Sequence, residues 1–131
     1  MRLLLDTHIA LWAIVDDPRL PAKARTLIED QSNSVAVSVA SIWEIAIKHS
    51  LSKGRADDMP IDGAAAVGYF RSAGYVILDI VAEHVVAVAE LAKHHKDPFD
   101  RLLVAQASVE TLQLVTSDTQ VAAYGGSILL V

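Results

Sequence analysis

Short apolar runs of strand length alternate along this chain with longer segments of helical periodicity. This alternation is typical of α/β folds, in which strands and helices follow one another. The apolar runs contain no regular polar positions, as expected for strands that are buried on both faces of a parallel sheet. Five strands are predicted, at Arg2–Leu5, Val35–Val37, Tyr75–Leu78, Leu114–Thr116 and Ile128–Val131.

The segments between the strands predict seven helices, and right-handed crossovers place such helices on both faces of the sheet. Residues that favour helix ends mark several boundaries: Pro21 and Pro98 suit first-turn positions, and Gly74 and Gly125 suit helix stops. The helices are expected at His8–Val15, Pro21–Asp30, Val39–Leu51, Gly63–Ser72, Ala82–His94, Pro98–Leu112 and Thr119–Tyr124.

Composition limits the classes of function. A chain of 131 residues has the length of one domain, so we expect a single domain over residues 1–131. Because cysteine is absent, any metal must be bound by oxygen or imidazole ligands. The net charge of −5 argues against a broad basic surface for nucleic acid.

No apolar run is long enough to span a membrane, and Asp6 comes too early for a secretory signal, so we expect a cytoplasmic protein.

Carboxylates stand at the points where a parallel α/β sheet binds its ligands, which is the edge formed by the carboxyl ends of the strands. Asp6 directly follows the first predicted strand, and Asp118 follows the fourth. Glu44 lies near the start of the helix after the second strand, and Asp100 lies in the first turn of the helix before the fourth. These four side chains are therefore expected to converge.

Three of these acids also have a purely structural interpretation. Asp6 and Asp118 could cap the helices that follow them, since Asp is a favoured N-cap. Glu44 stands three residues after Ser41, which fits a capping box, and four before Lys48, which fits an ion pair on a helix surface. At these positions both interpretations stay open.

Asp100 is harder to explain as a structural residue, whereas Asp97 fits an N-cap. On a helical wheel Asp100 shares a face with Leu103, Val104 and Ala107, so it is expected to have the least access to water of the four acids. A buried carboxylate is costly unless positive charge compensates it, and clustered carboxylates repel one another. With oxygen ligands and no thiols, the compensating cation is expected to be Mg²⁺ or Mn²⁺.

Four stretches of the sequence resemble the motifs of PIN-domain ribonucleases, and most closely those of VapC-type toxins of bacterial type II toxin–antitoxin pairs. They are Leu4-Leu5-Asp6-Thr7-His8, Ser38-Val39-Ala40-Ser41-Ile42-Trp43-Glu44-Ile45, Asp97-Pro98-Phe99-Asp100-Arg101-Leu102-Leu103-Val104-Ala105-Gln106-Ala107 and Val115-Thr116-Ser117-Asp118. The resemblance covers nearly the whole chain. It implies a sheet of order 3-2-1-4-5 and a catalytic metal site made of Asp6, Glu44, Asp100 and Asp118.

The resemblance also implies an activity, which is the metal-dependent hydrolysis of RNA to leave a 5′-phosphate and a 3′-hydroxyl. In a two-metal mechanism one ion activates a water molecule and the other stabilises the leaving oxygen. Around the four acids, an outer shell is expected to contain Thr7, Asp97, Thr116 and Ser117. Contacts to RNA phosphates are expected from the basic residues nearby, His94, His95, Lys96 and Arg101, although a solvated helix end is the alternative.

Two partners are expected besides RNA. The predicted first helix is apolar on all sides from Ile9 to Val15, which indicates either contact with another chain or a buried central helix. The resemblance implies both a homodimer and a cognate antitoxin peptide that binds beside the active site.

Two other classes of function stay open. A non-catalytic PIN-like binding module is expected to lack at least one of the four acids, and none is missing. A phosphoryl-transfer domain of the receiver or haloacid-phosphatase type would need a carboxylate next to Asp6 or a lysine at a strand end. Here Thr7 follows Asp6, and the last predicted strand ends at Val131.

Overall fold

A computed structural model describes all 131 residues and contains one five-stranded sheet. The strands are β1 (Arg2–Leu5), β2 (Ser34–Ser38), β3 (Val76–Leu78), β4 (Gln113–Thr116) and β5 (Ile128–Leu130). Every pair of neighbouring strands is parallel, in the order β3-β2-β1-β4-β5. The predicted α/β class and strand order are therefore confirmed.

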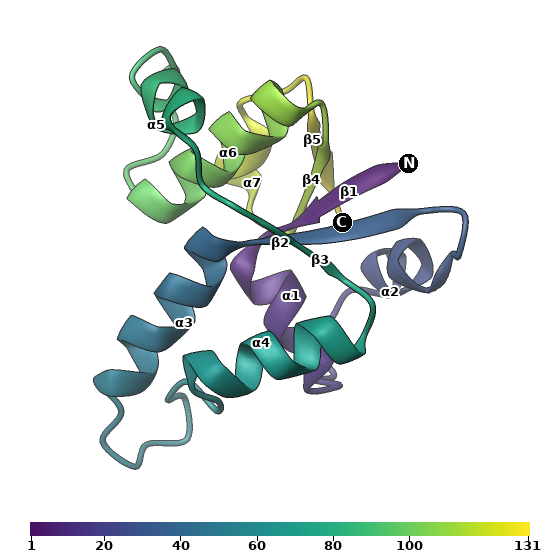
Figure 1. The fold of residues 1–131 in the computed structure, drawn as a ribbon, viewed down its shortest axis with the longest axis vertical. Helices are drawn as coiled ribbons and strands as arrows, with labels where there is room; N and C mark the ends of the chain where they lie inside the picture. Colours follow the sequence, from purple (N-terminus) through teal and green to yellow (C-terminus); the bar gives the residue numbers. More distant parts are fainter.

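Seven helices surround the sheet (Figure 1). They are α1 (Thr7–Ile14), α2 (Ala22–Glu29), α3 (Val39–Ser50), α4 (Gly63–Ser72), α5 (Ala82–Val88), α6 (Pro98–Glu110) and α7 (Thr119–Ala122). Side chains of α1, α2 and α4 pack on one face of the sheet, and those of α6 and α7 pack on the other. None of these helices combines the length and the apolar character that crossing a membrane would require.

The core is divided between the two faces of the sheet because successive strand residues point in opposite directions. In β1, Leu3 and Leu5 join the cluster that contains Ile9 of α1 and Phe70 of α4. Leu4 joins the cluster on the opposite face, which also contains Leu103, Val104 and Ala107 of α6. The central strands β2, β1 and β4 are thus buried on both sides, as their uninterrupted apolar runs predict, whereas the edge strands β3 and β5 are only partly buried.

The apolar helix α1 lies inside the fold. Ile9, Ala10 and Leu11 are buried, and Trp12 packs against the same core. The excess of apolar residues in this helix is therefore explained by burial within the chain, and contact with another chain is not needed to cover it. None of the large apolar side chains that are exposed belongs to α1, and several of them lie on α3 and α5.

The helix predicted at Ala82–His94 is shorter than expected, because α5 ends at Val88. The Val88 carbonyl accepts hydrogen bonds from the Leu91 N–H and from the Arg101 guanidinium, so it does not need a further helical turn. Several β-branched residues in α5 also lower its helix propensity. The His94–Lys96 segment consequently lies in a loop, and the other predicted helix ends differ by no more than two residues.

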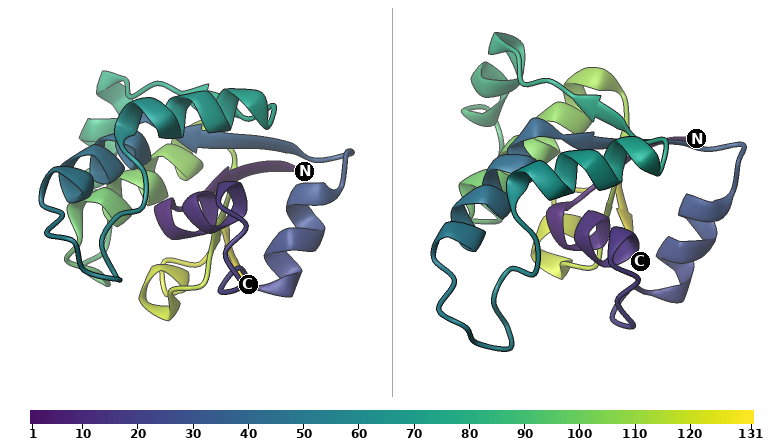
Figure 2. Two further views of the ribbon diagram at one scale, coloured as in Figure 1. Left: turned by 90° about the horizontal axis from the view of Figure 1, so that it is seen from below. Right: turned by 60° about the horizontal axis from the view of Figure 1, so that its bottom comes forward.

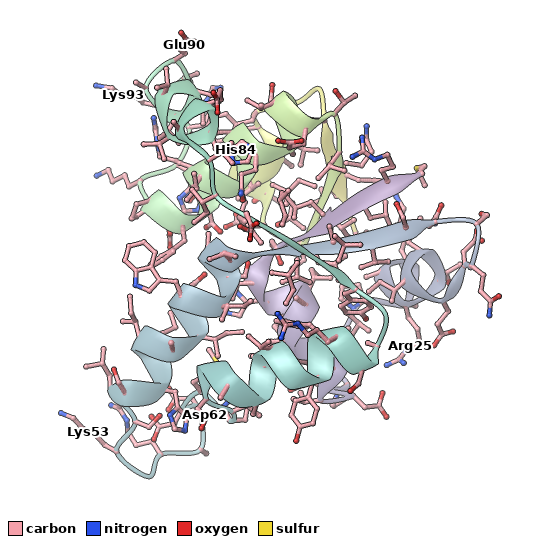
Figure 3. The ribbon with its side chains drawn as sticks, in the orientation of Figure 1. Arg25, Lys53, Asp62, His84, Glu90 and Lys93 are labelled. Carbon is pink, nitrogen blue, oxygen red and sulfur yellow. The ribbon has the colours of Figure 1, made fainter.

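A buried histidine fixes α5 on α6. His84 lies between the two helices (Figure 3), and its Nε2 is 2.8 Å from Oε1 of Glu110. Its Nδ1 accepts a hydrogen bond from the Val81 N–H, so the ring proton resides on Nε2 and points to the glutamate. This bond keeps α5 against the helix that carries Asp100.

Candidate metal centre

Acidic side chains from three parts of the chain line one pocket at the carboxyl edge of the sheet. The pocket has a volume of about 390 Å³, and we call it the acid pocket. Its acids are Asp6, Asp97, Asp100 and Asp118, and its other lining residues are His8, Trp12, His95 and Ser117. Because β1 and β4 are neighbours, the residues that follow them meet at this edge. No lysine or arginine lines the pocket.

Asp6 is held in place by the start of α1. Its Oδ1 accepts a hydrogen bond from the Ile9 N–H at 2.9 Å, and its Oδ2 accepts one from the Thr116 hydroxyl. The residue is only 6% exposed. Burial raises the pKa of its carboxyl above the usual value, and the nearby charge of Asp118 adds to this effect. Asp6 therefore caps a helix and also contributes negative charge to the acid pocket.

The environment of Asp100 strongly perturbs its carboxyl group. It lies in the first turn of α6, and its side chain is 22% exposed. Burial, together with the charges of Asp97, Asp6 and Glu44, raises its pKa to about 7, although His95 acts in the opposite direction. The metal-free site therefore favours the protonated form of Asp100 far more than water does.

Asp118 has a more open position. It caps α7 by accepting a hydrogen bond from the Gln120 N–H at 2.8 Å, and its side chain is about two-fifths exposed. Burial alone would raise the pKa of this carboxyl, but hydrogen bonds from Gln120 and His95 outweigh it and lower the pKa. Asp118 is therefore ionised where Asp100 is partly protonated.

His95 lies between two of the acids. Its Nε2 is 3.2 Å from Oδ2 of Asp100 and 3.1 Å from Oδ2 of Asp118. Its Nδ1 accepts a hydrogen bond from the Asp97 N–H, so the proton of the neutral ring is on Nε2 and faces the carboxylates. The sequence predicts that His95 belongs to a basic rim. In the structure, the short loop before α6 instead brings its ring into the acid pocket.

Glu44 does not line the acid pocket, although its charge contributes to the raised pKa of Asp100. The side chain is 5% exposed, and its Oε2 pairs with Lys48 Nζ at 2.6 Å. Its Oε1 is buried and has no hydrogen-bond partner. The predicted ion pair with Lys48 is present, but Glu44 is buried rather than on the surface. The N-cap of α3 is Ser38, so the predicted capping box with Ser41 is absent.

The predicted outer-shell residues take different positions. The Thr116 hydroxyl donates to Asp6 and accepts from the Asp118 N–H, so it connects two acids of the acid pocket. Asp97 caps α6 by accepting from Phe99 and Asp100 N–H groups. Ser117 lines the pocket and makes no hydrogen bond to an acid. Thr7 is turned away, because its hydroxyl donates to Ser41 of α3.

The residues predicted to bind phosphates also lie in different surroundings in the structure. Lys96 and His94 are exposed on the loop before α6, and the His94 ring packs edge-on against Tyr124. The Arg101 guanidinium donates to the carbonyls of Val88 and His95 and lines an apolar groove away from the acid pocket. Arg101 thus anchors the loop that carries His95.

A divalent cation fits this set of side chains. Three ligand atoms, one each from His95, Asp100 and Asp118, lie within 4.8 Å of one another. Glu44 offers a buried carboxylate oxygen without a partner, and burial together with neighbouring carboxylates raises the pKa of Asp100, an effect that a bound cation would oppose. Carboxylate oxygens are the ligands that Mg²⁺ and Mn²⁺ prefer.

Comparison with known proteins places this geometry in a family. A family model described as PIN domain matches residues 3–126. No curated protein matches the sequence.

Solved structures share the fold at low sequence identity. VapBC2 from Rickettsia felis, bound to a DNA fragment from its promoter, has a TM-score of 0.68 and 21% identity, over 100% of this chain and 98% of that chain. A toxin–antitoxin complex from Klebsiella pneumoniae has a TM-score of 0.66 and 18% identity, over 97% and 95%. VapBC-5 from Mycobacterium tuberculosis has a TM-score of 0.63 and 22% identity, over 99% and 97%.

Proposed function

The chain belongs to the PIN domain family, and from this we propose that it is a metal-dependent endoribonuclease, the toxin of a VapC-type toxin–antitoxin pair. The observation that carries the proposal is the convergence of Asp6, Asp100 and Asp118 on one pocket without a lysine or arginine. Acids that only capped helices would not need to share a pocket. The raised pKa of Asp100 supports a site that a cation completes.

The proposed reaction is the hydrolysis of an RNA phosphodiester that leaves a 5′-phosphate and a 3′-hydroxyl. Bound Mg²⁺ or Mn²⁺ would activate water and stabilise the leaving oxygen in a two-metal arrangement. Asp6, Asp100 and Asp118 would hold the ions, with Glu44 supplying a further carboxylate from α3. Thr116 keeps Asp6 and Asp118 oriented through its hydroxyl group.

His95 keeps the acids in place when no cation is bound. Its Nε2–H lies between Asp100 and Asp118, and its position depends on the Asp97 N–H and on the hydrogen bond from Arg101 to its carbonyl. In this arrangement the imidazole Nε2 lies between the two carboxylates and reduces the repulsion between them. Lys96, exposed on the same loop, would contact a flanking phosphate.

We also propose two protein partners, a second copy of the chain and a cognate antitoxin. Two of the solved structures with this fold are toxin–antitoxin systems by their descriptions, the complex from Klebsiella pneumoniae and VapBC-5. An apolar groove of about 450 Å³ between α3, α5 and α6 supports such contacts, because it includes the exposed side chains of Trp43 and Val85. A ribonuclease toxin would act in the cytoplasm, where its RNA substrates are.

The proposed activity is tested with purified protein and RNA. We expect hydrolysis with Mg²⁺ or Mn²⁺ and none after dialysis against EDTA. Asp6→Asn, Glu44→Gln, Asp100→Asn and Asp118→Asn should each lower the rate by orders of magnitude, whereas Asp97→Asn should lower it much less, because asparagine also caps helices. Activity that survives EDTA would contradict the metal mechanism. If Asp97→Asn abolished cleavage and Asp100→Asn did not, the assignment at the start of α6 would be wrong.

A further inference from the structure

A second cavity adjoins the acid pocket. It has a volume of about 300 Å³ and lies between α1, the end of α3 and the loops that follow these helices, and we call it the α1 cavity. His8 and Trp12 line both cavities, so their side chains form the shared wall. Figure 2 shows the loop between α3 and α4 beside α1. A molecule bound across this wall would therefore touch both cavities.

The sign of the charge changes across the wall. The acid pocket is lined by four aspartates and no lysine or arginine. The α1 cavity is lined by Arg19, Lys48 and Arg55, against the two acids Asp57 and Asp58. The lining of the α1 cavity thus holds one more cation than acids, and the partners of Arg19 and Lys48, Asp17 and Glu44, lie outside the lining. An RNA strand could thus place one phosphate at the metal centre and the next beside these cations.

The three cations are oriented by protein acids and keep free donors. Arg19 binds both oxygens of Asp17 through Nε and Nη2, which leaves Nη1 unused. Lys48 uses one of its three N–H groups on Glu44. Arg55 Nε is 3.7 Å from Asp58 Oδ1, too far for a hydrogen bond. Each side chain therefore has N–H groups available for a phosphate.

The wall also offers flat groups for a nucleobase. The Arg19 guanidinium lies 5.2 Å from the centre of the Trp12 ring, and the His8 ring lies 5.6 Å from it. Nucleobases stack on aromatic rings and on guanidinium planes with little dependence on sequence. A volume of about 300 Å³ is at the lower end of the usual range for small-ligand sites.

We propose that the α1 cavity binds one unpaired nucleotide of the RNA, next to the scissile phosphate. Its base would stack against the Trp12 and Arg19 pair, and its phosphate would lie beside Lys48 and Arg55. The inference rests on the proposed ribonuclease function. The nucleotide must be unpaired, because a base must leave a duplex before it can enter a cavity.

The test uses Trp12 as a fluorescent reporter. In Trp43→Phe only one tryptophan remains, so its emission reports on the shared wall. We expect adenosine 5′-monophosphate, which contains no phosphodiester bond to cleave, to quench this emission in EDTA. Inorganic phosphate should quench much less, since it has no base.

Charge variants in this background locate the binding. Arg55→Gln should weaken nucleotide binding about three- to tenfold, because it removes a charged donor. Lys53→Gln is the matched control, since Lys53 lies in the same loop, points away from the molecule (Figure 3) and does not line the cavity. Its affinity should stay within about twofold of the parent.

Several results would overturn the proposal. One is the absence of quenching by the nucleotide, and another is an equal affinity of the two charge variants. A third is quenching by polyglutamate but not by the nucleotide, which would assign the cavity to an acidic peptide. Each would do so even if the protein cleaves RNA with Mg²⁺. Because binding is measured without metal, failure of the ribonuclease proposal is recognised separately, in the cleavage assay.

Discussion

Asp100 lies where helix geometry and solvation favour different charge states. The first turn of α6 favours a negative charge, but burial and three neighbouring acids raise the pKa of the side chain to about 7. The helical wheel predicts the burial of Asp100, whereas Asp6 and Glu44 are in fact less exposed. Their burial depends on the strand β1 and on the packing of α1 against α3. The apolar pattern of a single helix gives no information on these contacts.

The raised pKa of Asp100 predicts a pH dependence of stability. Its folded pKa of about 7 exceeds the ordinary value of 3.8, so the fold favours the protonated form. The resulting stabilisation is complete below about pH 4 and is lost as the pH rises to about 7, by at most about 4 kcal/mol. Urea denaturation in EDTA should show that wild type loses more stability over this range than Asp100→Asn. Parallel curves for the two proteins would contradict the assignment.

At the scale of elements, local patterns predicted most of the fold. Apolar strands, cap residues and Pro98 at the start of α6 predicted the elements in their correct order. The early end of α5 was not predictable, because it depends on the Arg101 side chain from the next helix. Arg101 also donates a hydrogen bond to the His95 carbonyl, and the sequence gives no sign of this contact. The sequence therefore predicts His95 on a basic rim, whereas in the structure it lies between two acids. Long-range hydrogen bonds of this kind leave no periodic signal in the sequence.

Arg101 therefore has a testable role as an anchor of the loop before α6. Arg101→Gln removes the hydrogen bonds to the Val88 and His95 carbonyls, so the loop should lose its fixed position. We expect a lower cleavage rate and no change in the salt dependence of RNA binding, because no phosphate contact is lost.

Lys96→Gln provides the comparison, since Lys96 is exposed on the same loop. Loss of one phosphate contact should reduce the slope of log affinity against log salt by about 0.7 for single-stranded RNA. A reduced slope in Arg101→Gln would show that Arg101 binds RNA and would contradict its role as an anchor.

At the scale of the whole molecule, the apolar surface lies away from the helix that the sequence singles out. Helix α1 is covered by the chain itself, and the exposed apolar groove is formed by α3, α5 and α6. The groove and the acid pocket share the start of α6, so a chain bound in the groove would lie close to Asp100. Partner binding and catalysis would thus be linked through one helix.

The proposed homodimer predicts the effect of a charge in the groove. Val85 is 57% exposed there, and Val85→Glu should shift the protein from dimer to monomer, because a buried unpaired charge is costly. Val109→Glu is the matched control, since Val109 is exposed on α6 outside the groove. Light scattering after size-exclusion chromatography measures the mass. A monomeric wild type, or equal effects of both changes, would refute the groove as the dimer contact.

The central claim is that the converging acids form one metal site, and thermal melting with and without Mn²⁺ tests it most directly. Without metal, Asp100→Asn should melt at or above the wild-type temperature, because a repelling charge is removed. Mn²⁺ at about 100 times its Kd should stabilise wild type and Asp97→Asn by about 2.7 kcal/mol and leave Asp100→Asn almost unchanged. If Asp100→Asn melts below wild type without metal, and neither protein responds to Mn²⁺, Asp100 is only a helix-start residue and the metal site is refuted.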